Sequence, residues 1–160
     1  MKKKILCRMP DGTTATLTTK EANQIIKDKG LAPGGDSQAF HTQNVLRRIK
    51  KYMPFLSGVL YKLTQIQTDI RKPEIVTDAP QAEYLFEGKK MIDPKINASG
   101  FMTPEGWRSR KGSVKVLTGT PLQYTKTKNP LAGPHWDRAL SAAEGKAMAA
   151  DLQRYQDRKG

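Results

Sequence analysis

Side chains that could perform chemistry are few in this 160-residue sequence, and their spacing brings none of them together. The two histidines, His41 and His135, lie far apart and have no paired cysteines, which argues against a zinc site. Ser57 lacks the Gly-x-Ser-x-Gly turn of a nucleophilic serine, and no base accompanies it. Glu83 and Glu87 have the spacing of a helical metal pair, but solvated acids explain it better. We therefore expect no enzyme, no metal site and no cofactor.

The beginning of the sequence and its apolar content bear on its location. Cys7 is the single cysteine and has no disulfide partner within the chain, which suits a reducing compartment. Residues 1–7 resemble the basic start of a signal peptide, but Arg8 follows where an apolar segment of about 7 to 15 residues is needed. No apolar stretch approaches the roughly 20 residues of a membrane span. We expect neither a signal peptide nor a membrane segment.

Positive charge is the strongest signal in the sequence. Lys and Arg number 28 against 15 Asp and Glu, which gives a formal net charge of +13. Residues 47–72 and 89–128 are cationic and flank an acidic block at residues 73–88. Such blocks suit either a polyanionic partner or self-association between acidic and basic faces. The side chains predicted to face DNA are Arg47, Arg48, Lys50, Lys51, Arg108, Arg110, Lys111 and Lys115.

The residues that must position these groups divide into two predicted regions. In residues 1–35 we expect a β-hairpin over residues 3–17 and a short helix over residues 20–29. Thr18 or Thr19 is the predicted helix cap, Glu21 lies in the first turn, and Gly30 ends the helix. The Pro-Gly-Gly run at residues 33–35 marks the boundary to a second region, residues 36–160.

The second region mixes helices and strands, with a long loop or arm at about residues 89–113. Apolar spacing predicts an amphipathic helix from Asp36 or Ser37 to about Met53, and a final helix over residues 135–155. Residues 79–87 predict a short helix or an extended edge that ends at Gly88. The predicted strands are residues 59–70, 74–77, 114–117 and 122–125. The predicted fold class is α+β.

Three stretches resemble a known protein family. Residues 51–60 (KYMPFLSGVL), 78–88 (DAPQAEYLFEG) and 122–139 (LQYTKTKNPLAGPHWDRA) resemble, in order, three signatures of the minor capsid or head-tail connector proteins of long-tailed bacteriophages. The resemblance covers roughly residues 37–150 and leaves residues 1–35 outside. Gln81 and Asp137 depart from it, because aromatic residues are usual at those positions.

The resemblance implies a virion protein of the neck, made in the host cytoplasm. Such tail-completion proteins form homo-oligomeric rings that join the portal side of the head to the tail tube, with genomic DNA passing through the lumen. Their fold has two main helices packed on a small antiparallel sheet. Trp136 is the expected core anchor of the last helix. The expected subunit or partner contacts are Pro54, Phe55, Gly58, Leu60, Ala79, Pro80, Tyr84, Gly88 and Trp107.

A second hypothesis is a stand-alone basic nucleic-acid-binding module. It would use the cations of residues 47–51 and 108–115, with Trp107 as a group that stacks on bases. No helix-turn-helix, zinc-finger or RNA-recognition signature accompanies these residues. A nuclease is not expected, because the clustered acids that hold catalytic metal ions are missing from the sequence pattern.

Overall fold

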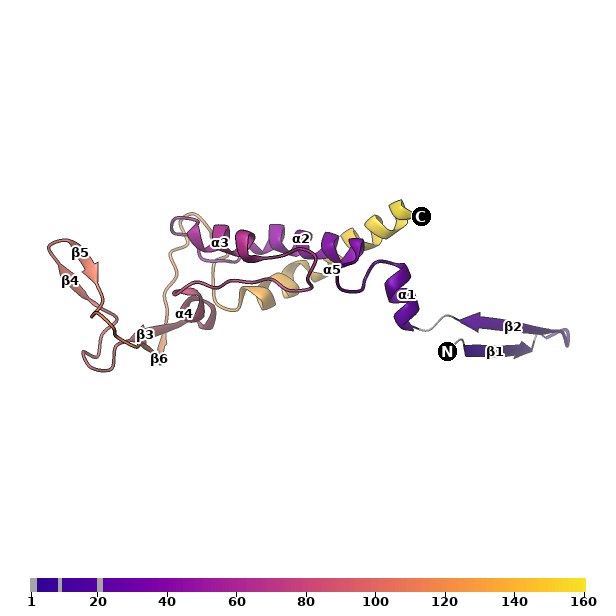
Figure 1. Ribbon diagram of the computed structural model, residues 1–160, viewed down its shortest axis with the longest axis horizontal. Helices are drawn as coiled ribbons and strands as arrows, with labels where there is room; N and C mark the ends of the chain where they lie inside the picture. The colour runs from indigo at the N-terminus through magenta and orange to yellow at the C-terminus, as the bar shows by residue number, and fades with distance from the viewer. Residues whose placement is uncertain (1–2, 9, 20–21) are drawn as a thin grey trace.

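The computed structural model describes residues 3–8, 10–19 and 22–160. Figure 1 shows an elongated chain in which a helical body lies between an N-terminal hairpin and an arm of short strands at the opposite end. Helices and short antiparallel strand pairs occur together, so the predicted α+β class is confirmed. No helix within the described residues is long and apolar enough to cross a membrane.

The N-terminal unit is a hairpin followed by a short helix, as predicted. β1 (Lys3–Arg8) pairs with β2 (Thr14–Thr19), and α1 (Ala22–Asp28) follows. Asp11 closes the turn by accepting hydrogen bonds from the backbone N–H and the hydroxyl of Thr13, at 2.9 and 2.6 Å. Thr18 and Thr19 belong to β2, so neither has the predicted capping position. Residues 20 and 21, including the predicted first-turn acid Glu21, lie outside the described residues.

Two long helices form the helical body. α2 (Asp36–Ile49) and α5 (Trp136–Lys159) pack along each other, and the predicted final helix is confirmed and continues to Lys159. α2 ends earlier than the predicted Met53, because the N–H groups of Lys51 and Tyr52 donate to carbonyls only three residues back, those of Arg48 and Ile49, at 3.4 and 3.0 Å, which is the pattern of a turn. The buried hydrophobic cluster of the body consists of Leu46, Ile49, Tyr52, Met53, Leu60, Tyr61, Trp136, Leu140 and Met148.

The prediction of a strand over residues 59–70 is wrong, because this segment contains the helix α3 (Val59–Gln67). Its buried side chains are Leu60, Tyr61 and Thr64, which is helical spacing. The Tyr61 hydroxyl donates to the Leu46 carbonyl of α2 at 3.1 Å, which ties α3 to the body. Packing against the body therefore overrides the partial alternation of apolar and polar residues that favoured a strand.

The prediction of a strand over residues 74–77 is also wrong. Within the described residues this segment pairs with no strand, and polar side chains at the end of α3, those of Gln67 and of the capping residue Thr68, satisfy its backbone. The Val76 N–H donates to the Thr68 hydroxyl at 3.1 Å, and the Asp78 N–H donates to the Gln67 side chain at 2.7 Å. Backbone groups that a sheet would have paired are thus paired by side chains of a helix.

The arm, residues 89–121, begins where α4 (Ala82–Glu87) ends at Gly88, as predicted for the helix. β3 (Lys89–Ile92) pairs with β6 (Val116–Pro121), and β4 (Phe101–Thr103) pairs with β5 (Gly106–Arg108) further out. The predicted strands at 114–117 and 122–125 are corrected to the single strand β6. Residues 122–125 form no strand, because the Leu122 N–H donates to the Gly88 carbonyl at 2.8 Å and the chain then returns to the body.

Candidate assembly interface

The three stretches that carry the family resemblance meet at one place in the fold, where the body joins the arm. The His135 N–H donates to the Phe86 carbonyl at 2.8 Å, which joins the start of α5 to the end of α4. The Asn129 side-chain amide donates to the carbonyls of Lys50 and Met53 at 2.8 and 2.6 Å. The Tyr124 hydroxyl donates to the Leu85 carbonyl. These contacts hold residues 51–60, 78–88 and 122–139 side by side.

A groove of about 520 Å³ opens between these three stretches. Of the residues predicted to contact other subunits, it brings together five: Pro54, Phe55, Gly58, Leu60 and Tyr84. Leu85, Leu122 and Tyr124 extend its largely apolar and aromatic lining, and Leu56 and Val59 lie on it with 81% and 48% of their surface exposed. A concave surface of this composition is suited to receiving side chains from another protein.

Gly58 shapes the groove at the start of α3. Its backbone has a φ of +81°, which favours glycine. A Cβ at this position would lie 3.0 Å from the Phe55 ring, so the missing side chain allows Phe55 to lie against the turn. This double requirement explains a glycine in the turn that precedes α3.

A second hollow, of about 640 Å³, separates the arm from α4. Pro80, Tyr84 and Trp107, all predicted contact residues, line it. Gln81, Tyr84 and Leu122 are shared with the groove, so the two depressions are continuous. Trp107 remains 57% exposed, which means that the hollow is open rather than filled by the indole ring.

Ala79 and Gly88, the other predicted contact residues, line neither depression. Ala79 packs against the buried cluster of the body. Gly88 ends α4 with a φ of +69°, and a Cβ there would lie 2.8 Å from the Pro134 side chain. Trp136, the predicted core anchor, is 5% exposed and lies edge-on to Phe86, with 4.9 Å between the ring centroids. These three residues hold the groove in shape rather than forming its surface.

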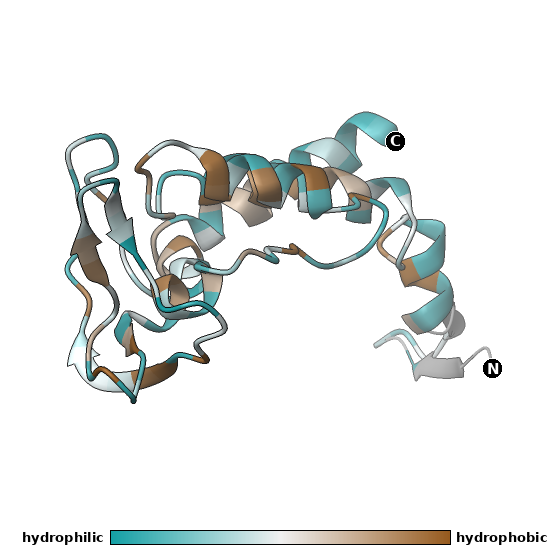
Figure 2. Ribbon diagram, turned by 60° about the vertical axis from the view of Figure 1, so that its left-hand side comes forward, coloured by the Kyte–Doolittle hydropathy of each residue, from teal (hydrophilic) through white to brown (hydrophobic). Residues whose placement is uncertain are grey.

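The arm exposes much of its apolar surface. Figure 2 shows hydrophobic segments in the arm at the left of the view, away from the helices. Its exposed large apolar residues are Ile96 (39%), Phe101 (45%), Met102 (72%), Trp107 (57%), Val114 (79%), Val116 (45%) and Leu117 (36%). Of these, Met102 and Trp107 lie side by side in the β4–β5 pair, and exposed apolar side chains that lie together are typical of a protein-contact site.

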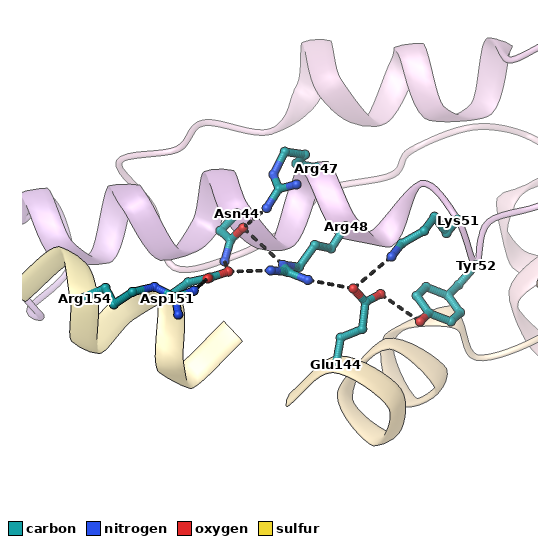
Figure 3. Close-up of polar contacts among 8 residues, drawn as sticks. All are labelled: Asn44, Arg47, Arg48, Lys51, Tyr52, Glu144, Asp151 and Arg154. Carbon is teal, nitrogen blue, oxygen red and sulfur yellow. Dashed lines mark hydrogen bonds and ion pairs between the residues drawn. The ribbon is translucent and has the colours of Figure 1, made fainter. Parts of the chain in front are cut away.

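The cations predicted to face DNA do not form one surface. Arg48 points toward α5, where it binds Glu144 at 2.7 Å and also pairs with Asp151 (Figure 3). Only 17% of its side chain is exposed, so the prediction of an outward-facing Arg48 is corrected. Lys51 also binds Glu144, at 2.9 Å, but its side chain is 53% exposed. Arg47 on α2 and Lys50, which directly follows α2, are exposed.

The two carboxyl groups in this network are strongly perturbed. Hydrogen bonds from Lys51, Tyr52 and Arg48 lower the pKa of Glu144 to about 2, against the opposing effect of burial. Asn44, Arg48 and Arg154 lower the pKa of Asp151 to about 2. This network was not predicted from the sequence. Its signal was present as two acids, seven positions apart on one face of the final helix, opposite a basic helix.

In the arm, as in the body, some of the cations predicted to face DNA are paired within the chain and others are exposed. Arg110 Nε binds the buried carboxylate of Asp93 at 2.8 Å, and this contact is the main cause of the lowered pKa of Asp93. Lys115 donates to the Ser109 hydroxyl at 2.7 Å. Arg108 and Lys111 are exposed, and neither has an ion pair within the described part of the chain. Arg110 therefore braces the base of the arm, whereas Arg108 and Lys111 are available to a partner.

The described residues contain no group of three or more His, Cys, Asp or Glu side chains placed to hold a metal ion. What the arrangement offers is surface for contact: an apolar groove, an exposed apolar arm and unpaired charges. In comparisons with known proteins, no protein family, no curated protein and no solved structure matches this chain.

Proposed function

We propose that the protein is a structural subunit of the neck of a long-tailed bacteriophage. It forms a homo-oligomeric ring that joins the portal side of the head to the tail and lets the genomic DNA pass. In this role the chain acts mechanically, through its contacts with other copies and with neighbouring neck and tail-tube proteins.

The convergence of the three family-like stretches is the observation that carries this proposal. Residues 51–60, 78–88 and 122–139 are far apart in sequence, yet hydrogen bonds and a shared groove bring them together. Stretches that resemble one family in sequence thus build one surface in space. That surface has the apolar lining of a protein-contact site, which suits an assembly subunit.

The exposed arm supports the same role. A single copy leaves Met102, Trp107 and Val114 more than half exposed, although a chain with a small core gains from burying such side chains. A ring requires two different patches on each subunit, one of which meets the other on the next copy. The groove and the exposed apolar side chains of the arm provide two such patches of different composition.

Assembly is favoured over the nucleic-acid-binding module by the state of the cations. Arg48 and Arg110 are neutralised by carboxylates of their own chain, which removes two of the eight side chains predicted to face DNA. Affinity for DNA depends on the number of phosphates that free cations neutralise. The cations that remain exposed, among them Arg47, Lys50, Arg108 and Lys111, still suit a lumen through which DNA passes.

Sedimentation velocity and negative-stain electron microscopy of the purified full chain, over a series of concentrations, test the proposal. We expect closed rings of one size. A chain that is monomeric at every concentration, but binds DNA with a steep salt dependence, would contradict the neck proposal and favour the nucleic-acid-binding module.

A further inference from the structure

Resting on the proposed function, we propose that the arm tip of one copy inserts into the groove of the next copy. The arm tip is the β4–β5 hairpin, residues 101–108, and the groove is the depression lined by residues 54–60, Tyr84, Leu85 and residues 122–125. The occupant of the groove is therefore a second copy of this chain, and the contact repeats from subunit to subunit around the ring.

The arm tip presents two large apolar side chains together. Met102 and Trp107 are directly opposite in the β4–β5 register, so they lie on the same face of the hairpin. They are 72% and 57% exposed. Gly100 supports this face, because a Cβ there would lie 2.7 Å from the Trp107 indole nitrogen. The indole is thus held against the backbone while its outer surface remains open to a partner.

The groove has an apolar floor and rim of matching chemistry. Leu60 is 5% exposed and forms part of its floor, whereas Leu56 on its rim is 81% exposed. Tyr84 and Tyr124 add aromatic surface to the lining. Aromatic and methionine side chains that enter such a groove are the residue types enriched at the centres of protein interfaces.

Charges beside the two surfaces are complementary. Arg108 ends the arm tip and Lys111 follows it, and both are exposed without an ion pair in the described residues. On α4, which provides Tyr84 and Leu85 to the groove, Glu83 and Glu87 also lack an ion pair within that part of the chain. Contact between two copies would pair these cations with these carboxylates and fix the direction of docking.

The contact has the geometry of a ring. The surfaces that meet are different, so each copy at the end of a chain of subunits keeps either a free groove or a free arm tip for the next copy. The β3–β6 pair connects the tip to the helical body, and Figure 1 shows the β4–β5 hairpin beyond it, at the end of the molecule away from α5. Repetition of the contact then closes a ring if the rotation between subunits is an integral fraction of a full turn.

Charge reversal tests the contact in the full chain. Arg108→Glu with Lys111→Glu, or Glu83→Lys with Glu87→Lys, should each weaken self-association about tenfold or more. The chain that carries all four substitutions should recover self-association to within about threefold of wild type, because the pairs are restored in reverse. Arg138→Glu with Lys146→Glu, two exposed cations of α5, is the matched control and should leave self-association unchanged.

A crosslink between different chains locates the contact directly. In a Cys7→Ser background, one chain carries Met102→Cys and the other Leu56→Cys. Oxidation of the mixture should give a covalent dimer that contains one chain of each kind. A doubly substituted chain that instead closes a disulfide within a monomer would show that the tip fills its own groove, and would overturn the inference.

The remaining outcomes separate this inference from the proposed function. Rings that form without the mixed crosslink, and that tolerate both charge reversals, would overturn the arm-in-groove contact and leave the neck proposal intact. A mixed crosslink in a species that never exceeds a dimer would support the contact and contradict the ring. A chain that stays monomeric and gives no mixed crosslink contradicts both.

Discussion

The helical body and the arm differ in how far their apolar and charged side chains are buried or paired within one chain. In the body, Met53, Leu140 and Trp136 are at most 5% exposed, and Arg48 lies between two carboxylates. In the arm, Met102 and Val114 are more than 70% exposed. The body thus buries an apolar core and pairs the Arg48 charge within one chain, whereas the arm leaves most of its large apolar side chains exposed.

The difference indicates which part of the molecule depends on assembly. Two-stranded hairpins are at best marginally stable in water unless something packs on them. The arm consists of two such pairs and is braced at its base by the Asp93–Arg110 ion pair. We infer that the body folds in a single copy and that the arm gains most of its order from a neighbour.

Substitution of the two tryptophans should give the largest difference between body and arm, measured as the change in the free energy of unfolding. Trp136→Ala removes a buried ring from the core and should lower the free energy of unfolding by about 3–5 kcal/mol. Trp107→Ala removes an exposed ring and should change the free energy of unfolding of the monomer by less than about 0.5 kcal/mol. Urea unfolding at a concentration that keeps the chain monomeric measures both.

For the arm, the corresponding measurement is the strength of self-association. Trp107→Ala should weaken self-association in sedimentation velocity although the monomer remains stable, because its ring is expected at the subunit contact. If Trp107→Ala destabilises the monomer as much as Trp136→Ala does, the arm belongs to the cooperative unit of the body and the contrast between the two regions fails.

Acidification should destabilise the body through its ion-pair network. Lys51 and its neighbours hold the pKa of Glu144 at about 2, below the ordinary value of 4.5, and the pKa of Asp151 is also about 2. Because the folded-state pKa values are depressed, the stabilisation is complete above pH 4.5 and is lost as the pH falls toward 2. Urea unfolding at a series of pH values from 7 to about 2.5 measures the loss.

Glu144→Gln is the control for this acid sensitivity. The glutamine keeps the size of the side chain but carries no charge and cannot titrate. The variant loses the ion pairs of Glu144 with Arg48 and Lys51, so it should be less stable than wild type at pH 7. The difference between the two proteins should shrink as the pH falls toward 2, where wild-type Glu144 also loses its charge. A difference that stays constant over the whole range would exclude Glu144 as a source of the acid sensitivity.

Helix positions in the body were predictable where caps, breakers and apolar spacing agreed. Gly35 before α2, Gly88 after α4 and the Pro-containing turn before α5 marked ends that the structure places within a few residues. The helix α3 was mistaken for a strand because Leu63 to Ile70 alternates in polarity. Its helical state depends on Tyr61 and Thr64, which are buried by contacts with segments distant in the sequence.

The candidate site was predictable in part. Sequence resemblance pointed to Pro54, Phe55 and Tyr84, which share the groove, but spacing along the chain could not show that Leu122 and Tyr124 join them. The basic helix face was predicted as one surface. Arg48 leaves that surface because Glu144 and Asp151 lie opposite it on α5, and contacts between distant helices are not encoded in local patterns.

The smallest expected difference between the two regions comes from two glycines, one at the joint between body and arm and one within the arm. Gly88 and Gly112 both have a φ of +69°, but a Cβ at Gly88 would lie 2.8 Å from Pro134 whereas nothing lies within 4 Å of one at Gly112. Gly88→Ala should therefore cost about 2 kcal/mol of unfolding free energy, from backbone strain and crowding. Gly112→Ala strains only the arm and should cost less than about 1 kcal/mol in the same urea transition. Equal losses would mean that arm and body unfold together, because strain at Gly112 in the arm would then lower the stability of the body as well.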